Sequence, residues 1–151
     1  MSTATLIDMP TEYRELVIDH FEDRSRDEVQ RQIDECLKFL YIVSTNKGRF
    51  IPLTREVDEV WHEMIVQTKF YMELCESLPG GCYIHHQSIG FSDYGERIGK
   101  REAVSQFLDW IPDYLENFGE FTSDTAKDWA VVQFIQQEFR LTLEQINRLG
   151  R

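Results

Sequence analysis

The sequence predicts an all-α protein, a single-domain helical bundle of about five to six helices over residues 1–151. Hydrophobic residues recur at spacings of three and four through most of the chain, which is typical of amphipathic helices. Glycine and proline gather instead around residues 79–99, where we expect an irregular loop. A chain of 151 residues buries one substantial core and rarely divides further, so we expect one domain.

The first third of the chain predicts two helices. The first opens at Pro10-Thr11, and the second follows Asp23-Arg24-Ser25 and ends near Asn46-Lys47-Gly48. One face of the first helix carries Tyr13, Leu16, Val17, His20 and Phe21. One face of the second carries Val29, Ile33, Cys36, Leu37, Leu40 and Val43.

The middle of the chain predicts an extended linker and then more helix. Pro52 disfavours helix for the residue before it, and Thr54 is a suitable N-cap for the segment that follows. Residues 55–78 contain neither glycine nor proline and carry two apolar stripes. This pattern leaves open whether they form one long helix or two helices broken near Gln67-Thr68.

The last third returns to the helical period. The stripe over residues 103–118 contains Pro112, which we expect to kink or interrupt it, and Gly119 is a natural stop. Thr125-Ala126-Lys127-Asp128 resembles a capping box, and apolar residues follow it at helical spacing as far as Ile146. We therefore expect a final helix that starts at this box.

Composition and charge exclude several classes of protein. The net charge is -11 and the isoelectric point is near 4.8, so direct binding of nucleic acid is disfavoured, because lysine and arginine supply most of that affinity. No apolar run approaches the roughly 18 residues needed to span a bilayer. The first residues lack the pattern of a signal peptide, and three cysteines do not pair evenly, so we expect a cytoplasmic protein with reduced thiols.

The acidity admits two interpretations. It gives either a solvated surface that keeps the protein soluble, or a face that holds a basic protein partner or mimics nucleic acid.

Three of the four histidines fall between residues 62 and 86, close to acidic residues and cysteine. Asp58 and His62 are four residues apart, so on a helix they share one side, at the border of the apolar face. Glu59 and Glu63 project further toward solvent and are weaker candidates. An Asp/His pair at this spacing can chelate a divalent ion, or the carboxylate can orient the imidazole for acid-base work.

The histidine pair in the predicted loop could complete such a site. His85 and His86 are adjacent, so in an extended segment they point in opposite directions and at most one joins His62 directly. Cys75 would lie about 20 Å from His62 along an unbroken helix, too far to share one metal ion, although a break at Gln67-Thr68 would relax that limit. We expect the Cys75 thiol to pack in the core.

Other chemistry finds little support. Cys82 and His85 offer a thiol and a base, but nothing identifies an oxyanion hole. His62-Glu63 begins like the zinc motif H-E-x-x-H but lacks its second histidine, and no phosphate-binding motif is present. In the competing interpretation the role is purely structural: Trp61 with His62 anchors its helix, Tyr71 hydrogen-bonds across the core, and the histidines satisfy buried backbone groups in the loop.

The segment from residue 52 to 90 resembles the glycine-rich domain-containing protein-like family. Its pattern D-x-V-W-H, then T-x-x-Y-x-x-x-C, then an H-H pair appears here as Asp58 to His62, Thr68 to Cys75, and His85-His86. The resemblance implies a helical fold and a marked position rather than a known activity. Many relatives carry a second histidine two residues after the first, and this chain has Met64 there.

Two hypotheses follow. The first is a helical protein that binds a divalent metal, Zn²⁺ or Fe²⁺, or a small ligand, through Asp58, His62, His85 and His86, since imidazole with carboxylate suits both ions. The alternative is a non-enzymatic acidic interaction domain, of adaptor, inhibitor or immunity type, in which the cluster is structural. Neither identifies a catalytic residue.

Overall fold

The computed structural model describes residues 7–45, 51, 53–81, 83–84 and 109–149. Over these residues the protein contains seven α-helices, one 3-10 helix and no strand, which confirms the all-α prediction. Most of the predicted loop, including His85 and His86, and the apolar stripe before Asp109 lie outside the described residues. No helix in the described part is long and apolar enough to cross a bilayer.

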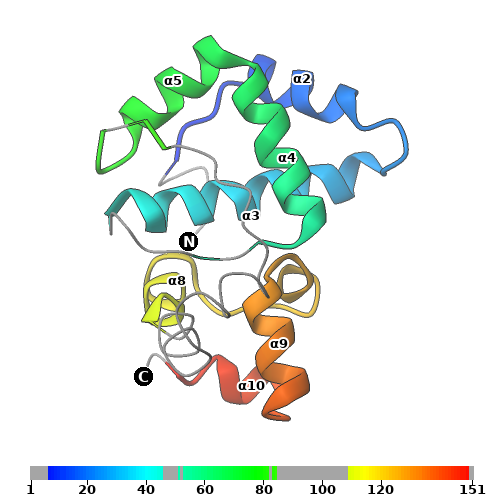
Figure 1. Cartoon of the computed structure of the whole chain (residues 1–151), viewed down its shortest axis with the longest axis vertical. Coiled ribbons are helices and arrows are strands. Elements are labelled where there is room, and N and C mark those ends of the chain that lie inside the picture. Colours follow the sequence, from blue (N-terminus) through cyan, green and yellow to red (C-terminus); the bar gives the residue numbers. More distant parts are fainter. Residues whose placement is uncertain (1–6, 46–50, 52, 82, 85–108, 150–151) are drawn as a thin grey trace, which may run out of the picture.

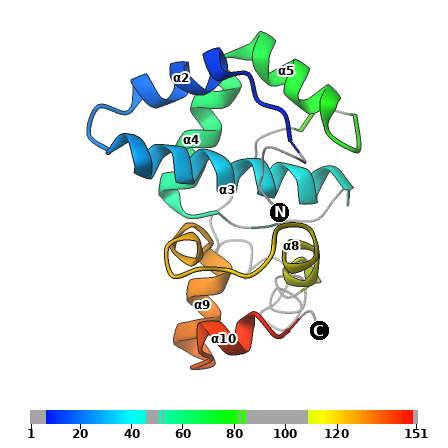
Figure 2. The same ribbon diagram turned by 180° about the vertical axis from the view of Figure 1, so that it is seen from behind.

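Figures 1 and 2 show two groups of helices on opposite sides of the long central helix α3. The elements, in chain order, are α2 (Thr11–His20), α3 (Arg26–Thr45), α4 (Arg55–Val66), α5 (Thr68–Ser77), α8 (Ile111–Phe118), the 3-10 helix η1 (Thr125–Asp128), α9 (Ala130–Glu138) and α10 (Leu143–Ile146). Helices α2 and α4 pack on α3 from one side, and α8 and η1 pack on it from the other. The predicted bundle is therefore built around one helix.

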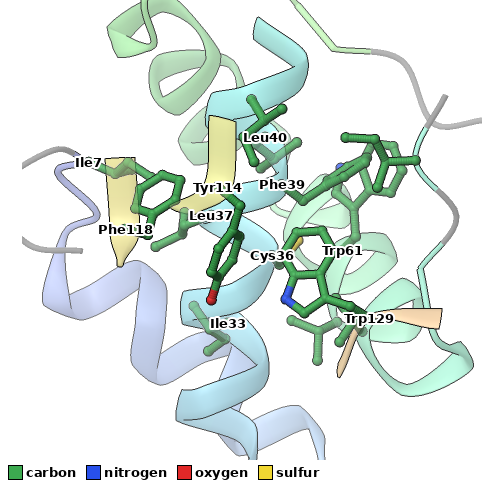
Figure 3. Packing of buried hydrophobic residues seen from close by; sticks show 14 of the residues in the cluster. Ile7, Ile33, Cys36, Leu37, Phe39, Leu40, Trp61, Tyr114, Phe118 and Trp129 are labelled. Atoms are coloured by element: carbon green, nitrogen blue, oxygen red, sulfur yellow. The ribbon is translucent and has the colours of Figure 1, made fainter. Parts of the chain in front are cut away.

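Because it is covered on both sides, α3 is buried beyond the single stripe that its sequence predicts. The predicted residues Ile33, Cys36 and Leu37 face the core, and Figure 3 shows them close to aromatic residues from the C-terminal half of the chain. The side chains of Gln32 and Glu35 are also buried, although both are polar. A polar side chain costs free energy when buried unless it is hydrogen-bonded, so the partners of these residues matter.

Glu35 supplies one polar connection between α3 and the C-terminal half. Its Oε1 accepts hydrogen bonds from the Tyr114 hydroxyl at 2.6 Å and from Trp129 Nε1 at 3.0 Å, and its Oε2 lies 2.5 Å from Lys38 Nζ. Each oxygen of the carboxylate thus has a partner. Tyr114 also stacks on Phe121, with ring centroids 3.9 Å apart, so the polar connection lies within an aromatic cluster.

Arg31 and Asp128 form a second connection. The guanidinium donates from Nε and from a terminal nitrogen to both carboxylate oxygens of Asp128, at 2.9 and 3.1 Å. Burial raises the pKa of the Asp128 carboxyl, and the Arg31 hydrogen bond opposes that rise. The Thr54 hydroxyl reaches the Asp128 carbonyl oxygen at 3.4 Å, so the start of α4 also contacts η1.

Residues 55–78 form two helices rather than one, with the break at Gln67. In a continuous helix the Met64 carbonyl oxygen would accept from the amide four residues on. Here it accepts instead from the Tyr13 hydroxyl at 2.7 Å, and Tyr13 is fully buried. The hydrogen bond from α2 therefore satisfies a carbonyl group that the break leaves free.

The ends of these two helices follow the sequence. The Thr54 hydroxyl accepts from the Val57 amide, which confirms the predicted N-cap. Helix α5 ends at Ser77, and the turn that follows packs against the end of α3, where the Gly80 amide donates to the Ser44 hydroxyl at 2.6 Å. A Cβ atom at Gly80 would overlap the Ser44 carbonyl oxygen, so this turn requires glycine.

The C-terminal prediction of one helix from Thr125 to Ile146 is wrong. The predicted capping box forms η1 instead, and the helix after it, α9, ends at Glu138. Arg140 has a positive φ of 53°, a backbone conformation that an α-helix does not contain. The capping box in this region belongs to Thr142 and Gln145, which start α10.

The interruption predicted at Pro112 is present: Trp110 is a turn, α8 begins at Ile111, and Pro112 occupies its first turn, where its missing amide costs nothing. The prediction for α2 changes in detail. In α2, Tyr13 and Val17 are buried as predicted, but Leu16 is exposed and Ile18 is buried in its place.

Candidate functional site: helix α4 and its contact with Ile84

Helix α4 packs against the core through an apolar face, with Trp61 among its buried residues. Met64, at the position where relatives of the resembled family carry a second histidine, is fully buried in this face. A side chain at position 64 therefore points into the core, away from the exposed side of α4. The remaining candidate ligands on α4 are Asp58 and His62.

The two residues differ in exposure. Asp58 is half-buried, as expected for the border of the apolar face, and its charge contributes to raising the pKa of the buried Cys36 thiol, for which burial is the larger cause. His62 is exposed, so its predicted place at that border is wrong. Because the two lie one helical turn apart, the carboxylate and the imidazole still share one side of α4.

Glu63 departs from the prediction that it faces solvent, whereas Glu59 follows it. The Glu63 side chain is only 13% exposed, and its Oε2 lies 3.5 Å from His20 Nδ1 on α2. Glu59 remains exposed and accepts from Arg24 at 2.8 Å. Helix α2 covers this side of α4, a tertiary contact that the helical period of α4 does not reveal.

Trp61, Tyr71 and Ile84 form a buried hydrogen-bonded chain. Trp61 Nε1 donates to the Tyr71 hydroxyl oxygen at 3.0 Å, and that hydroxyl donates to the Ile84 carbonyl oxygen at 2.6 Å. The chain joins α4, α5 and the segment after α5 at a single oxygen atom. Trp61 directly precedes His62 in the sequence, and Ile84 directly precedes His85. The neighbours of these two histidines are therefore linked to each other through the Tyr71 hydroxyl.

Cys75 belongs to the same cluster. Its thiol is buried, as predicted, and interacts with the Tyr71 side chain and the Ile84 backbone. Burial raises the pKa of the thiol, although the two hydrogen bonds oppose the shift. At neutral pH Cys75 is therefore protonated, a state that suits packing rather than nucleophilic attack or metal ligation.

The described residues contain no group of three or more His, Cys, Asp or Glu side chains placed to hold a metal ion. Of the four predicted ligands, Asp58 and His62 lie in this part of the chain, whereas His85 and His86 lie outside it. Cys82, the thiol of the alternative nucleophilic scheme, is also outside it.

The structural interpretation of the sequence included a hydrogen bond from Tyr71 across the core, and the structure contains it. The two partners, Trp61 and Ile84, were not predictable, because residues on either side of a helix break have no fixed separation. The polar atoms of both rings were the available signal, since buried Trp and Tyr usually find hydrogen-bond partners.

No protein-family model, curated protein or solved structure matches this chain.

Proposed function

We propose that this protein binds a divalent metal ion, Zn²⁺ or Fe²⁺, beside α4, with Asp58, His62 and one of His85 or His86 as ligands. The observation that carries the proposal is the hydrogen bond from the Tyr71 hydroxyl to the Ile84 carbonyl, at 2.6 Å. It ties the residue before His85 to the cluster that contains Trp61, the neighbour of His62. The resemblance to the glycine-rich domain-containing protein-like family supports the same position, because its motif residues include these side chains.

The donor set suits the ion. One carboxylate and two imidazoles are ligands that Zn²⁺ and Fe²⁺ accept, and a water molecule can complete the coordination. Asp58 is half-buried, which limits competition from water for its carboxylate, whereas His62 is exposed and accessible to an ion from solvent. We propose binding rather than catalysis, because the two described cysteines are buried and the pKa values of their thiols are raised.

Metal content tests the proposal. The full chain, purified without a histidine tag, is incubated with Zn²⁺, desalted and analysed by elemental mass spectrometry, and affinity is then measured by isothermal titration calorimetry. We expect one ion per chain in the wild type and loss of tight binding in His62→Ala. Asp58→Asn, which keeps the size of the side chain, should weaken binding about 10- to 100-fold.

His20→Ala is the matched control, because His20 is an exposed histidine on α2 that is not a proposed ligand. It should bind Zn²⁺ as the wild type does, and circular dichroism should show the same helix content in all variants. Of His85→Ala and His86→Ala, one should lose binding. Wild-type protein that takes up no metal, or equal loss in His20→Ala and His62→Ala, contradicts the proposal.

A further inference from the structure

Two apolar side chains are exposed where α2 meets the break between α4 and α5. Leu16 of α2 is 40% exposed, and Val66, the last residue of α4, is 56% exposed. Single exposed apolar residues are common, but Leu16 lies one turn from Tyr13, whose hydroxyl contacts the Met64 carbonyl oxygen two residues before Val66. We call Leu16, Val66 and the partly buried Phe70 the α2 seam.

Two contacts set the path of α2 along this seam. The ring of Tyr13 stacks on Phe70 with centroids 5.0 Å apart, and one end of α2 is thereby placed on α5. The other end is placed on α4 by the contact between His20 and Glu63. Leu16 lies one turn from both Tyr13 and His20 along α2, so it projects at the middle of the seam.

The outer face of α2 beside Leu16 is acidic. Glu12 and Asp19 are both exposed, and their spacing of seven residues, with Leu16 between them, puts all three on one face of the helix. Glu15 lies on the same face and is ion-paired with Arg26. Leu16 of the seam therefore lies beside carboxylates on α2, in a chain whose net charge is -11.

We propose that the α2 seam binds a basic amphipathic helix of a partner protein. Apolar side chains of the partner would cover Leu16 and Val66, and its lysine or arginine residues would lie over Glu12 and Asp19. Charge complementarity selects this partner, because an acidic or neutral helix would gain the apolar contacts without the electrostatic attraction. The seam is independent of the proposed metal site, because none of its residues is a proposed ligand.

A designed peptide tests the proposal directly. The probe is a fluorescent helix-forming peptide of about 18 residues, roughly five helical turns, with leucine on one face and lysine on the other. One control peptide replaces the leucines by serine and keeps the charge, and another replaces the lysines by glutamate. Binding to the full chain is measured by fluorescence anisotropy at low and high salt, since surface electrostatics weaken as salt rises.

We expect the leucine-lysine peptide to bind and both control peptides to bind much more weakly. Leu16→Ser should weaken binding about three- to eightfold, the loss expected for the exposed part of one leucine. Glu12→Lys combined with Asp19→Lys should weaken it by at least about fivefold at low salt. Leu149→Ser is the control, because Leu149 is similarly exposed, at 45%, but follows α10 on the other side of α3.

Three outcomes would overturn the proposal. The serine-lysine peptide could bind as tightly as the leucine-lysine peptide, which would mean attraction to net charge alone. Leu16→Ser could bind as the wild type does, with unchanged circular dichroism. Sedimentation could instead reveal a dimer that Leu16→Ser abolishes, and the occupant of the seam would then be a second copy of this chain.

Discussion

Replacing Tyr71 by phenylalanine removes the hydroxyl that joins α4, α5 and Ile84. The ring stays in place, so the packing volume changes little, but Trp61 Nε1 and the Ile84 carbonyl oxygen both lose their partner at this oxygen. Leaving a buried polar group unsatisfied costs about 1–3 kcal/mol, and the two groups are coupled through one atom. We expect Tyr71→Phe to lower the free energy of unfolding by about 2–4 kcal/mol.

Urea unfolding at neutral pH, followed by far-ultraviolet circular dichroism, measures this change. Tyr41→Phe is the matched control, because Tyr41 is a half-buried tyrosine whose ring packs on Phe118 and whose hydroxyl makes no hydrogen bond to the described residues. We expect a change below about 0.5 kcal/mol for this control. If Tyr71→Phe is no less stable than Tyr41→Phe, the hydrogen-bonded chain contributes nothing to the fold and the reasoning is refuted.

The same variant separates the fold from the proposed function. If the Ile84 carbonyl positions His85 or His86, Tyr71→Phe should also weaken Zn²⁺ binding about 10-fold or more under conditions where the variant is fully folded. Unchanged Zn²⁺ affinity in a destabilised variant would limit the hydrogen-bonded chain to a structural role.

Three further changes probe the connections around α3. Gly80→Ala should lower the free energy of unfolding by about 1–3 kcal/mol in urea titrations, because its Cβ would overlap Ser44; a neutral effect would show that the turn can shift. Glu35→Ala should cost about 3–5 kcal/mol and change the near-ultraviolet circular dichroism of Trp129, since it leaves buried donors unpaired; a loss near 1 kcal/mol would contradict the connection. Burial first, and then Glu35, raise the pKa of Tyr114 above its ordinary value of 10.0, so the folded state keeps a proton that the unfolded state loses. The stability that Tyr114 contributes through its raised pKa is complete below pH 10 and is lost as the pH rises above 10. Tyr114→Phe should therefore make the fall of the unfolding free energy above pH 10 shallower by about 1.4 kcal/mol per pH unit. An unchanged slope would contradict the raised pKa of Tyr114.

The candidate site was predictable in part. The spacing of Asp58 and His62 placed them on one side of α4, which depends only on the geometry of the helix. The half-buried position of Asp58 was predicted, but the exposure of His62 and the partial burial of Glu63 were not, because α2 covers Glu63 from residues more than 40 positions earlier. Helical period alone ranks side chains by angle and carries no information about which neighbouring helix lies at that angle.

The sequence by itself determined the all-α class, the N-cap at Thr54 and the stop around Gly80, because apolar period, capping and backbone freedom act over a few neighbouring residues. Only the tertiary structure decided the break at Gln67 and the burial of Glu35. Tyr13 satisfies the carbonyl at the break from 51 positions away, and Trp129 satisfies Glu35 from 94 positions away. A polar group is stable in the core only when it is hydrogen-bonded, and the packing of the helices rather than the local sequence determines which distant residue supplies that bond.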